Sequence, residues 1–300
     1  MKKIKYSAHA VIAASLLLGA VSTVQAAEGG GSNYASGGDN FLMGAVPPPG
    51  FYTLVFGNMY RADKVLDHNG NTVTPDDFKL SANVVAPRFV WSTPYEVGSG
   101  TLVMHGIFPL VDLKVEAMGS SERKTGLGDI VFGPGIVHHH SQNLHSVLGV
   151  DFVAPTGDYD KNDGVNIGRN YWSTIALYTM SYIDPEGLNW DFKANLIFNQ
   201  ENSATHYKTG TEFDVDYSVG YGLGNDWTVG VSGYLYKQLK NDELNGVTLA
   251  DSKGSAFSIG PSVKYMNDKN WLFTAKFEKE FEVENRPSGY AFRLKTSIPF

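Results

Sequence analysis

The sequence of 300 residues contains no cysteine, and this absence excludes several classes of protein. Without thiols there can be no disulfide framework, no thiolate zinc site and no cysteine nucleophile. Charged residues make up 18% of the chain, below the level of about a quarter that is usual in soluble domains. Acidic residues outnumber basic ones by 31 to 24, which argues against a nucleic-acid partner.

Long apolar runs are also missing after the first residues. Three lysines among the first five residues precede an apolar run at 11–21, and Val24-Gln25-Ala26 fits a small-residue cleavage site. We therefore expect residues 1–26 to be a signal peptide that is cut after Ala26. No later stretch approaches the ~20 apolar residues of a membrane-spanning helix. The mature chain is then either soluble beyond the inner membrane or a β-barrel in the bacterial outer membrane.

Alternation of apolar and polar residues decides between these two. Trp227, Val229 and Val231, for example, alternate with Thr228 and Ser232, so that such a strand has one apolar and one polar face. Strands of soluble sandwiches are usually about 5–6 residues long, whereas a tilted strand that crosses a bilayer needs about 9–11. The alternating segments have the longer length, which indicates a barrel.

The pattern predicts twelve such strands, with connections that alternate between a longer and a shorter class. Outer-membrane barrels have this alternation, with long outer loops, short periplasmic turns and an even number of strands. Pro109 interrupts the third strand, and we expect a bulge there to re-phase it. The predicted strands are at 51–62, 78–92, 100–116, 126–139, 144–154, 171–183, 188–199, 210–223, 226–239, 254–266, 270–281 and 289–300.

Aromatic residues at the strand ends support the same fold. Trp91, Trp190, Trp227 and Trp271 lie next to predicted short turns and on the apolar parity of their strands, as in an interfacial girdle. Phe300 ends the last alternating strand, which is typical of the signal read by the outer-membrane assembly machinery. We predict an all-β, transmembrane antiparallel β-barrel over residues 51–300, surrounded by outer-membrane lipid.

The polar parity supplies candidates for the lining of the lumen. Their charges are mixed, so they either brace the barrel by pairing across it or form a constriction that selects solutes. The candidates are Arg88, Asp112, Lys114, Asp129, Asp151, Lys193, Asp214, Asp216, Lys276, Glu278, Glu280, Arg293 and Lys295.

Residues 27–50 form a Gly/Pro-rich segment ahead of the barrel. The glycines make it flexible, and the prolines at 47–49 make its last part stiff and extended. Tyr34, Phe41 and Leu42 are its candidate apolar anchors. The segment either plugs the lumen from the periplasmic side or hangs free, and we favour the plug.

No motif predicts catalysis, a metal or a cofactor. The acidic run that begins at Asp158 lacks the Gly and the Glu that an EF-hand loop requires at its sixth and twelfth positions. Consecutive histidines at 138–140 point to alternate faces of a strand end, so at most two of them can share an ion. We expect no cofactor and no enzymatic activity.

Several short motifs together resemble the outer-membrane family named for the meta-pathway of phenol degradation. The resemblance covers nearly the whole mature chain, and it implies an outer-membrane channel or transporter linked to aromatic or other hydrophobic compounds. The motifs are PPPGFY at 47–52, PRFVW at 87–91, TGLGDI at 125–130, GP at 133–134, PTGDY at 155–159, NIGRNYW at 166–172 and NRPSG at 285–289.

Three functions are compatible with such a barrel. The first is a channel or passive transporter for small-molecule solutes, aromatic or hydrophobic compounds included. The second is a structural or adhesive barrel that binds partners through its outer loops. The third is an outer-membrane lipase-type enzyme, which would need a converging serine, histidine and polar orienting residue that no local signature shows.

Overall fold

Fourteen antiparallel strand segments form the main sheet, which closes on itself because β1 (Gly50–Val65) pairs with both β2 and β18. The computed structural model describes residues 27–269 and 271–298. The other segments of this sheet are β2 (Lys79–Val97), β3 (Gly100–Ile107), β4 (Leu110–Ala117), β5 (Ser120–Leu127), β6 (Ile130–His139), β7 (Leu144–Ala154), β8 (Ser173–Tyr182), β9 (Leu188–Asn199), β12 (Glu212–Gly222), β13 (Trp227–Gln238), β16 (Ser255–Met266), β17 (Leu272–Glu284) and β18 (Pro287–Ile298).

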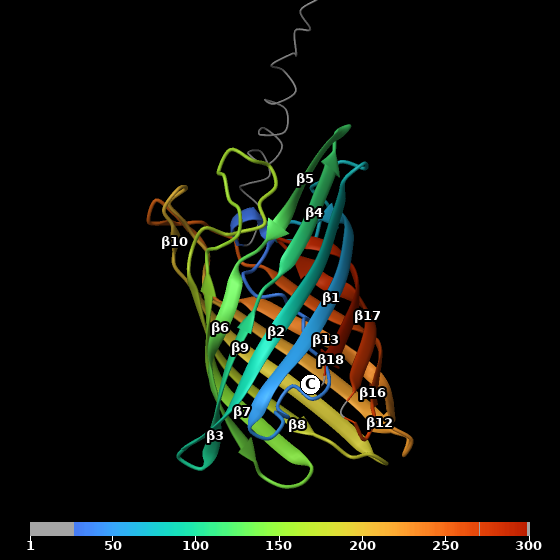
Figure 1. Cartoon of the computed structure of the whole chain (residues 1–300). Helices are drawn as coiled ribbons and strands as arrows, with labels where there is room; N and C mark the ends of the chain where they lie inside the picture. The colour runs from blue at the N-terminus through green and yellow to red at the C-terminus, as the bar shows by residue number, and fades with distance from the viewer. Residues whose placement is uncertain (1–26, 270, 299–300) are drawn as a thin grey trace, which may run out of the picture.

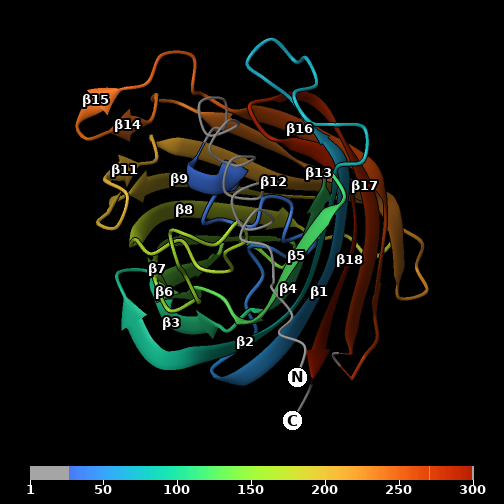
Figure 2. The ribbon, with the colours of Figure 1, turned by 90° about the horizontal axis from the view of Figure 1, so that it is seen from above.

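The barrel has twelve strands, which confirms the predicted fold class. β3 and β4 are successive parts of one barrel strand that pairs with β2, and β5 and β6 form the next one. Within the described residues, no helix has the length and apolar character needed to cross a membrane. The barrel stands upright in Figure 1, and Figure 2 shows its closed ring of strands from above.

Alternating side chains give the wall an apolar outer face and a mostly buried inner face. On β13, Val231 is 41% exposed whereas Ser232 is fully buried. On β17, Phe277 is 44% exposed whereas Glu278 is 1% exposed. An apolar belt on the outside of the strands is what lipid requires. The protein is an integral β-barrel of the outer membrane.

The two ends of the barrel differ in their connections. Long loops gather at the upper end in Figure 1, and short turns join the strands at the lower end. Two of the long loops pair with each other in a small sheet of β10 (Glu201–Asn202), β11 (Tyr207–Lys208), β14 (Glu243–Leu244) and β15 (Val247–Thr248). Because outer-membrane barrels carry their long loops outside, we call these ends the outer end and the periplasmic end.

The wall extends further at the outer end than the sequence predicted. The connection predicted at 117–125 is a tight turn at Met118 and Gly119 between β4 and β5, two paired strands. This hairpin projects upward beyond its neighbours in Figure 1. β4 belongs to the strand predicted at 100–116, whereas β5 is mostly polar and lacks the apolar parity that marks the other strands.

The parity that faces outward changes between β5 and β6, and not at Pro109 as expected. The register of the third strand against β2 runs unbroken through Pro109, since Ile107 pairs with Arg88 and Leu110 pairs with Val85. On the next strand, three residues at 128–130 lie opposite the two at 108–109. This extra residue is a bulge, and it switches which parity faces outward between β5 and β6.

The segment that precedes β1 lies inside the barrel. It appears in blue within the ring of strands in Figure 2. Its first part, the 3-10 helix η1 (Glu28–Gly30), is held by outer loops, and Gly44 contacts Ser181 on the wall near the periplasmic end. The segment therefore runs through the lumen from the outer end to the periplasmic end, where it joins β1.

Candidate functional site in the barrel interior

Asp216 on β12 fixes the middle of the N-terminal segment. Its carboxylate accepts hydrogen bonds from the Tyr34 hydroxyl at 2.7 Å, the Gly37 amide at 2.6 Å and the Asp39 amide at 3.1 Å. Gly37 has a φ of 73°, and a Cβ there would lie 2.5 Å from a carboxylate oxygen of Glu278. The wall and segment therefore meet where only glycine fits.

Lys295 on β18 holds the next residues of the segment. Its ammonium lies 2.7 Å from the Asp39 carboxylate and donates to the carbonyl oxygens of Asn40 and Phe41, at 2.7 Å for Phe41. Arg88 on β2 reaches the other oxygen of Asp39 at 4.0 Å. Two strands that lie on either side of β1 thus converge on one carboxylate of the segment.

The charge on Asp39 is maintained by these cations. Burial alone would raise the pKa of the carboxyl group, but Lys295, Lys193 and Arg88 outweigh burial and lower the pKa to about 2. Asp39 is therefore ionised at neutral pH. Its contacts are attractions between opposite charges in a buried setting, where such attractions are stronger than in water.

A second charged group on β17 and β18 supports the same stretch. Glu278 bridges Lys276 at 3.2 Å and Arg293 at 2.6 Å. Both cations also reach the segment, because Lys276 donates to the carbonyl of Asp39 at 3.2 Å and Arg293 to that of Ser36 at 2.7 Å. Each of these two cations is thus paired on the wall and bonded to the segment.

Nearer the periplasmic end the segment is held through its backbone amides. Met43 donates to Asp191 at 3.1 Å, Gly44 donates to Ser181 at 2.7 Å, and Ser181 in turn donates to Asp191. A Cβ on Gly44 would lie 3.0 Å from the carbonyl oxygen of His145, so this residue lies directly against the wall. From Tyr34 to Gly44 the segment is bonded to the barrel along its length.

The inner wall also contains apolar surface, set among polar side chains. Two buried clusters lie on the inward parity of β2, β3 and β6–β9, and side chains of the segment, including Tyr34 and Val46, pack against them. The lumen therefore offers two apolar clusters as well as charged groups, and the segment contacts both. The first cluster contains Val90, Val103, Val137 and Val147, and the second contains Val153, Ile175, Leu177 and Ile197.

Most of the thirteen lumen candidates lie on the inner face. Asp151 pairs with His105 at 2.8 Å, Lys193 lies over the ring of Tyr34, and Glu280 accepts from the hydroxyl of Tyr60 at 2.8 Å. The candidates on the inner face are Arg88, Asp151, Lys193, Asp214, Asp216, Lys276, Glu278, Glu280, Arg293 and Lys295.

Two candidates, Asp112 and Lys114, do not face the lumen, and the structure corrects their assignment. They share the outward parity of β4 with Leu110, which is 54% exposed. Asp112 bonds Arg123 at 2.6 Å on the outer face. The expected re-phasing at Pro109 would have turned these residues inward, but no re-phasing occurs there.

A third candidate, Asp129, lies in the bulge and supports an outer loop. Its carboxylate accepts from the backbone amides of Gly157 and Arg169, both at 2.8 Å. Burial raises the pKa of Asp129, although these hydrogen bonds oppose the shift. Asp129 is therefore a cap for the loop at 155–172 and not a residue of the lumen lining.

Four tryptophans are predicted to form an interfacial girdle, and Phe300 is predicted to be the assembly signal. Trp227 and Trp271 are exposed beside short turns, and Trp190, partly exposed, stacks on Tyr182. Trp91 is 39% exposed, but β2 continues beyond it to Val97, so it does not end its strand. Phe300 lies outside the described residues, and its role in assembly stays a prediction.

Sequence reasoning did not single out several residues of the inner wall. Asp191 and Ser181 share the inward parity of their strands, and Asp191 lies two residues before Lys193, so the alternation pointed to it. His105 lies on a strand where both parities contain apolar residues, which hid its direction. The candidate anchors Phe41 and Leu42 lie in the lumen segment, and both have positive φ, 26° and 61°.

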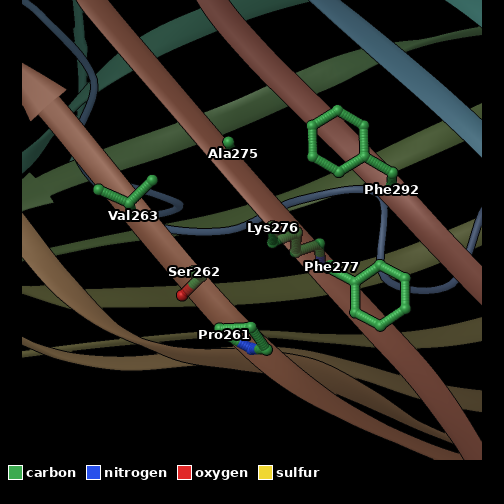
Figure 3. A pocket seen from close by; sticks show the side chains of 7 residues that line it. All are labelled: Pro261, Ser262, Val263, Ala275, Lys276, Phe277 and Phe292. Atoms are coloured by element: carbon green, nitrogen blue, oxygen red, sulfur yellow. The ribbon is translucent and has the colours of Figure 1, made fainter.

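A shallow hollow of about 240 Å³ lies on the lipid side of the wall and not in the lumen. Figure 3 shows Phe277 and Phe292 beside it, with Lys276 on the far side of the wall. Pro261 faces Phe277 here and has no N–H to donate, so the ladder between β16 and β17 is interrupted. The hollow belongs to the lipid-facing surface.

The fold and interior define an outer-membrane β-barrel that holds its own N-terminal segment in the lumen. Residues 62–296 match the model of a family described as "Putative MetA-pathway of phenol degradation", and the chain belongs to this family. A search of curated proteins gave no match.

A solved structure shows the same architecture. The COG4313 outer membrane channel from Pseudomonas putida F1 is similar with a TM-score of 0.75 and 18% identity, over 85% of this chain and 97% of that one. The translocator domain of the autotransporter NalP from Neisseria meningitidis has a TM-score of 0.48 and 9% identity, over 86% of this chain and 91% of that one. At these identities the first likeness shows the fold, and the second adds no argument about function.

Proposed function

We propose that this protein is a passive outer-membrane channel for small hydrophobic solutes, aromatic compounds among them, and that displacement of residues 29–46 opens it. The observation that carries the proposal is the pair of apolar clusters on the inner wall. The lumen of a water-filled porin is polar, whereas here Val103 and Val153 are at most 5% exposed and belong to two apolar clusters inside the barrel.

The two apolar clusters give a hydrophobic solute a favourable surface once the segment has moved. Removal of apolar area from water stabilises a contact by roughly 25 cal/mol per Å². A bound solute can therefore replace the contacts that Tyr34 and Val46 make with these clusters in the closed state. The family, named for phenol degradation, supports the same substrate class, and the similar outer membrane channel from Pseudomonas putida F1 supports a channel.

Charged groups on β12 and β18 hold the segment in the closed state. Asp216, Lys295 and Arg293 bond the segment mostly through its backbone, so the segment can leave without breaking the barrel ladder. Such a segment acts as a gate in the sense of a loop whose displacement admits the solute. Passage is passive, and the solute moves down its own concentration gradient.

Uptake of an apolar probe by intact cells tests this function. Lipopolysaccharide slows the entry of an uncharged naphthylamine dye, which becomes fluorescent when it reaches the inner membrane. This dye should enter cells faster when the protein is present. Ile175→Asn places an amide in the apolar cluster and should slow uptake, whereas Ile175→Val keeps the surface apolar and should not. Equal dye uptake with and without the folded protein would contradict the proposal.

A further inference from the structure

The backbone nitrogen of Ala27 lies in a buried acidic site at the outer end of the lumen. It is 3.1 Å from Oδ2 of Asp242, a residue of the loop between β13 and β16. Ala27 is 1% exposed and Asp242 is fully buried. The start of the segment is therefore enclosed by the outer loops and is not a free tail.

Among the residues that the structure describes, Asp242 has hydrogen-bond donors around it but no cation. Its carboxylate accepts from the Gly210 amide at 2.7 Å, the Gln238 side chain at 2.5 Å and the Tyr207 hydroxyl at 2.5 Å. None of the ion pairs found among the described residues includes Asp242. A buried carboxylate is costly unless a positive charge balances it, so this site calls for a cation.

The backbone of Ala27 is strained in the uncut chain. Its φ is 60° and its ψ is 146°, a combination that L-residues with a Cβ rarely adopt. The torsion φ exists only while a residue precedes Ala27. Cleavage after Ala26, where the signal-peptide motif predicts it, would remove this strained torsion altogether.

We propose that Asp242 is the binding site for the α-ammonium group that signal cleavage creates on Ala27. Hydrolysis of the Ala26–Ala27 peptide bond consumes one water, leaves a carboxylate on Ala26 and gives Ala27 a protonated amine at neutral pH. The nitrogen already lies at hydrogen-bonding distance from Asp242, so the new charge completes the site without any movement of the segment.

Glu28 extends this anchor to two further outer loops. Its carboxylate accepts from Thr205 at 2.6 Å and from Asn202 at 2.8 Å, and its carbonyl accepts from Arg169 at 2.8 Å. Together with Asp242, these contacts join the loops at 155–172, 200–211 and 239–254. The processed N-terminus thus fastens the outer end of the segment, and only the part further along can swing away from the wall. This anchor does not depend on which solute the barrel passes.

Reactivity of the α-amine tests the proposal on the exported wild-type protein. Intact mass should show a chain that starts at Ala27. An amine-selective acylating reagent at pH 7, where lysines are almost fully protonated, should label the α-amine of the native barrel at least about tenfold more slowly than that of the unfolded chain, because a buried group reacts only when it opens locally.

Two variants separate the ion pair from simple burial. Asp242→Asn removes the charge, and a Gly-Ser insertion between Ala26 and Ala27 moves the amine out of the site, so each should raise the labelling rate about tenfold. Asp251→Asn changes an exposed acid of the same loop and should leave the rate unchanged. If Asp242→Asn does not fold, the insertion variant decides. A mature chain that starts at another residue, or a native α-amine that reacts as fast as the unfolded one, would overturn the proposal.

Discussion

Replacement of Lys295 by methionine should free the segment from the wall while the barrel stays intact. Methionine keeps most of the aliphatic length of lysine and removes the ammonium. That ammonium is bonded to the Asp39 carboxylate at 2.7 Å, to the carbonyl oxygen of Phe41 at 2.7 Å and to that of Asn40. Lys295 is 4% exposed, so water cannot readily take its place.

The size of the effect follows from these contacts. Removal of one partner of a buried ion pair costs about 3–5 kcal/mol, because the other charge remains buried without compensation. When the segment is released, Asp39 returns to water, so most of this cost favours release. A shift of about 3 kcal/mol raises the ratio of released to bound segment about 100-fold, since each 1.4 kcal/mol is a factor of ten.

Single-channel recording in a planar bilayer measures this ratio directly as the fraction of time spent open. Lys295→Met should raise that fraction strongly at neutral pH, and retained heat-modifiability on gels would show that the barrel is folded. Lys269→Met, in an exposed turn between β16 and β17, is the matched control and should behave as wild type. An open fraction for Lys295→Met within twofold of wild type would refute the role given to Lys295.

Three further outcomes are expected. The pKa of Asp39 is lowered to about 2 from 3.8. Its contribution to closure is therefore complete above about pH 4 and is lost as the pH falls through about 2. Conductance should rise only in that acidic range, and a rise centred near pH 6 would contradict this. Val231→Arg puts a charge on the lipid face and should lower the free energy of unfolding by about 2–4 kcal/mol near the bilayer midplane, whereas Val231→Ile should change it little. An epitope tag at Asn69 should be labelled on intact cells and one at Asn225 should not, and equal labelling of both would contradict the assigned topology.

The barrel could be predicted from the sequence because lipid imposes a simple rule on its strands. The strand predicted at 226–239 is β13 (Trp227–Gln238), and the one predicted at 144–154 is β7 (Leu144–Ala154). Each residue that faces lipid must be apolar, and its neighbours face a different environment, so the alternation is strong. Where the wall leaves the bilayer, as in β5 (Ser120–Leu127), this constraint ends and the strand was not recognised.

The sequence could predict on which face of the wall an interior residue lies, from its parity along the strand, but not which groups it contacts. Parity placed Asp216 and Lys295 on the inner face, but no pattern showed that their partners are backbone groups of Gly37 and Phe41. Parity also failed at Asp112, because the bulge that re-phases the wall lies at 128–130 on the next strand. A one-residue insertion in a strand reverses the face of every later residue, and its position depends on the pairing of the neighbouring strand.

The most direct test of the account is the conductance of a barrel that lacks the segment. Deletion of residues 29–46, with the signal cleavage site and the prolines at 47–49 retained, removes the contacts with Asp216 and Lys295 and leaves every strand in place. We expect a folded, heat-modifiable barrel with a higher single-channel conductance and weaker selectivity than wild type. A folded deletion variant with unchanged conductance would show that the segment does not close the lumen.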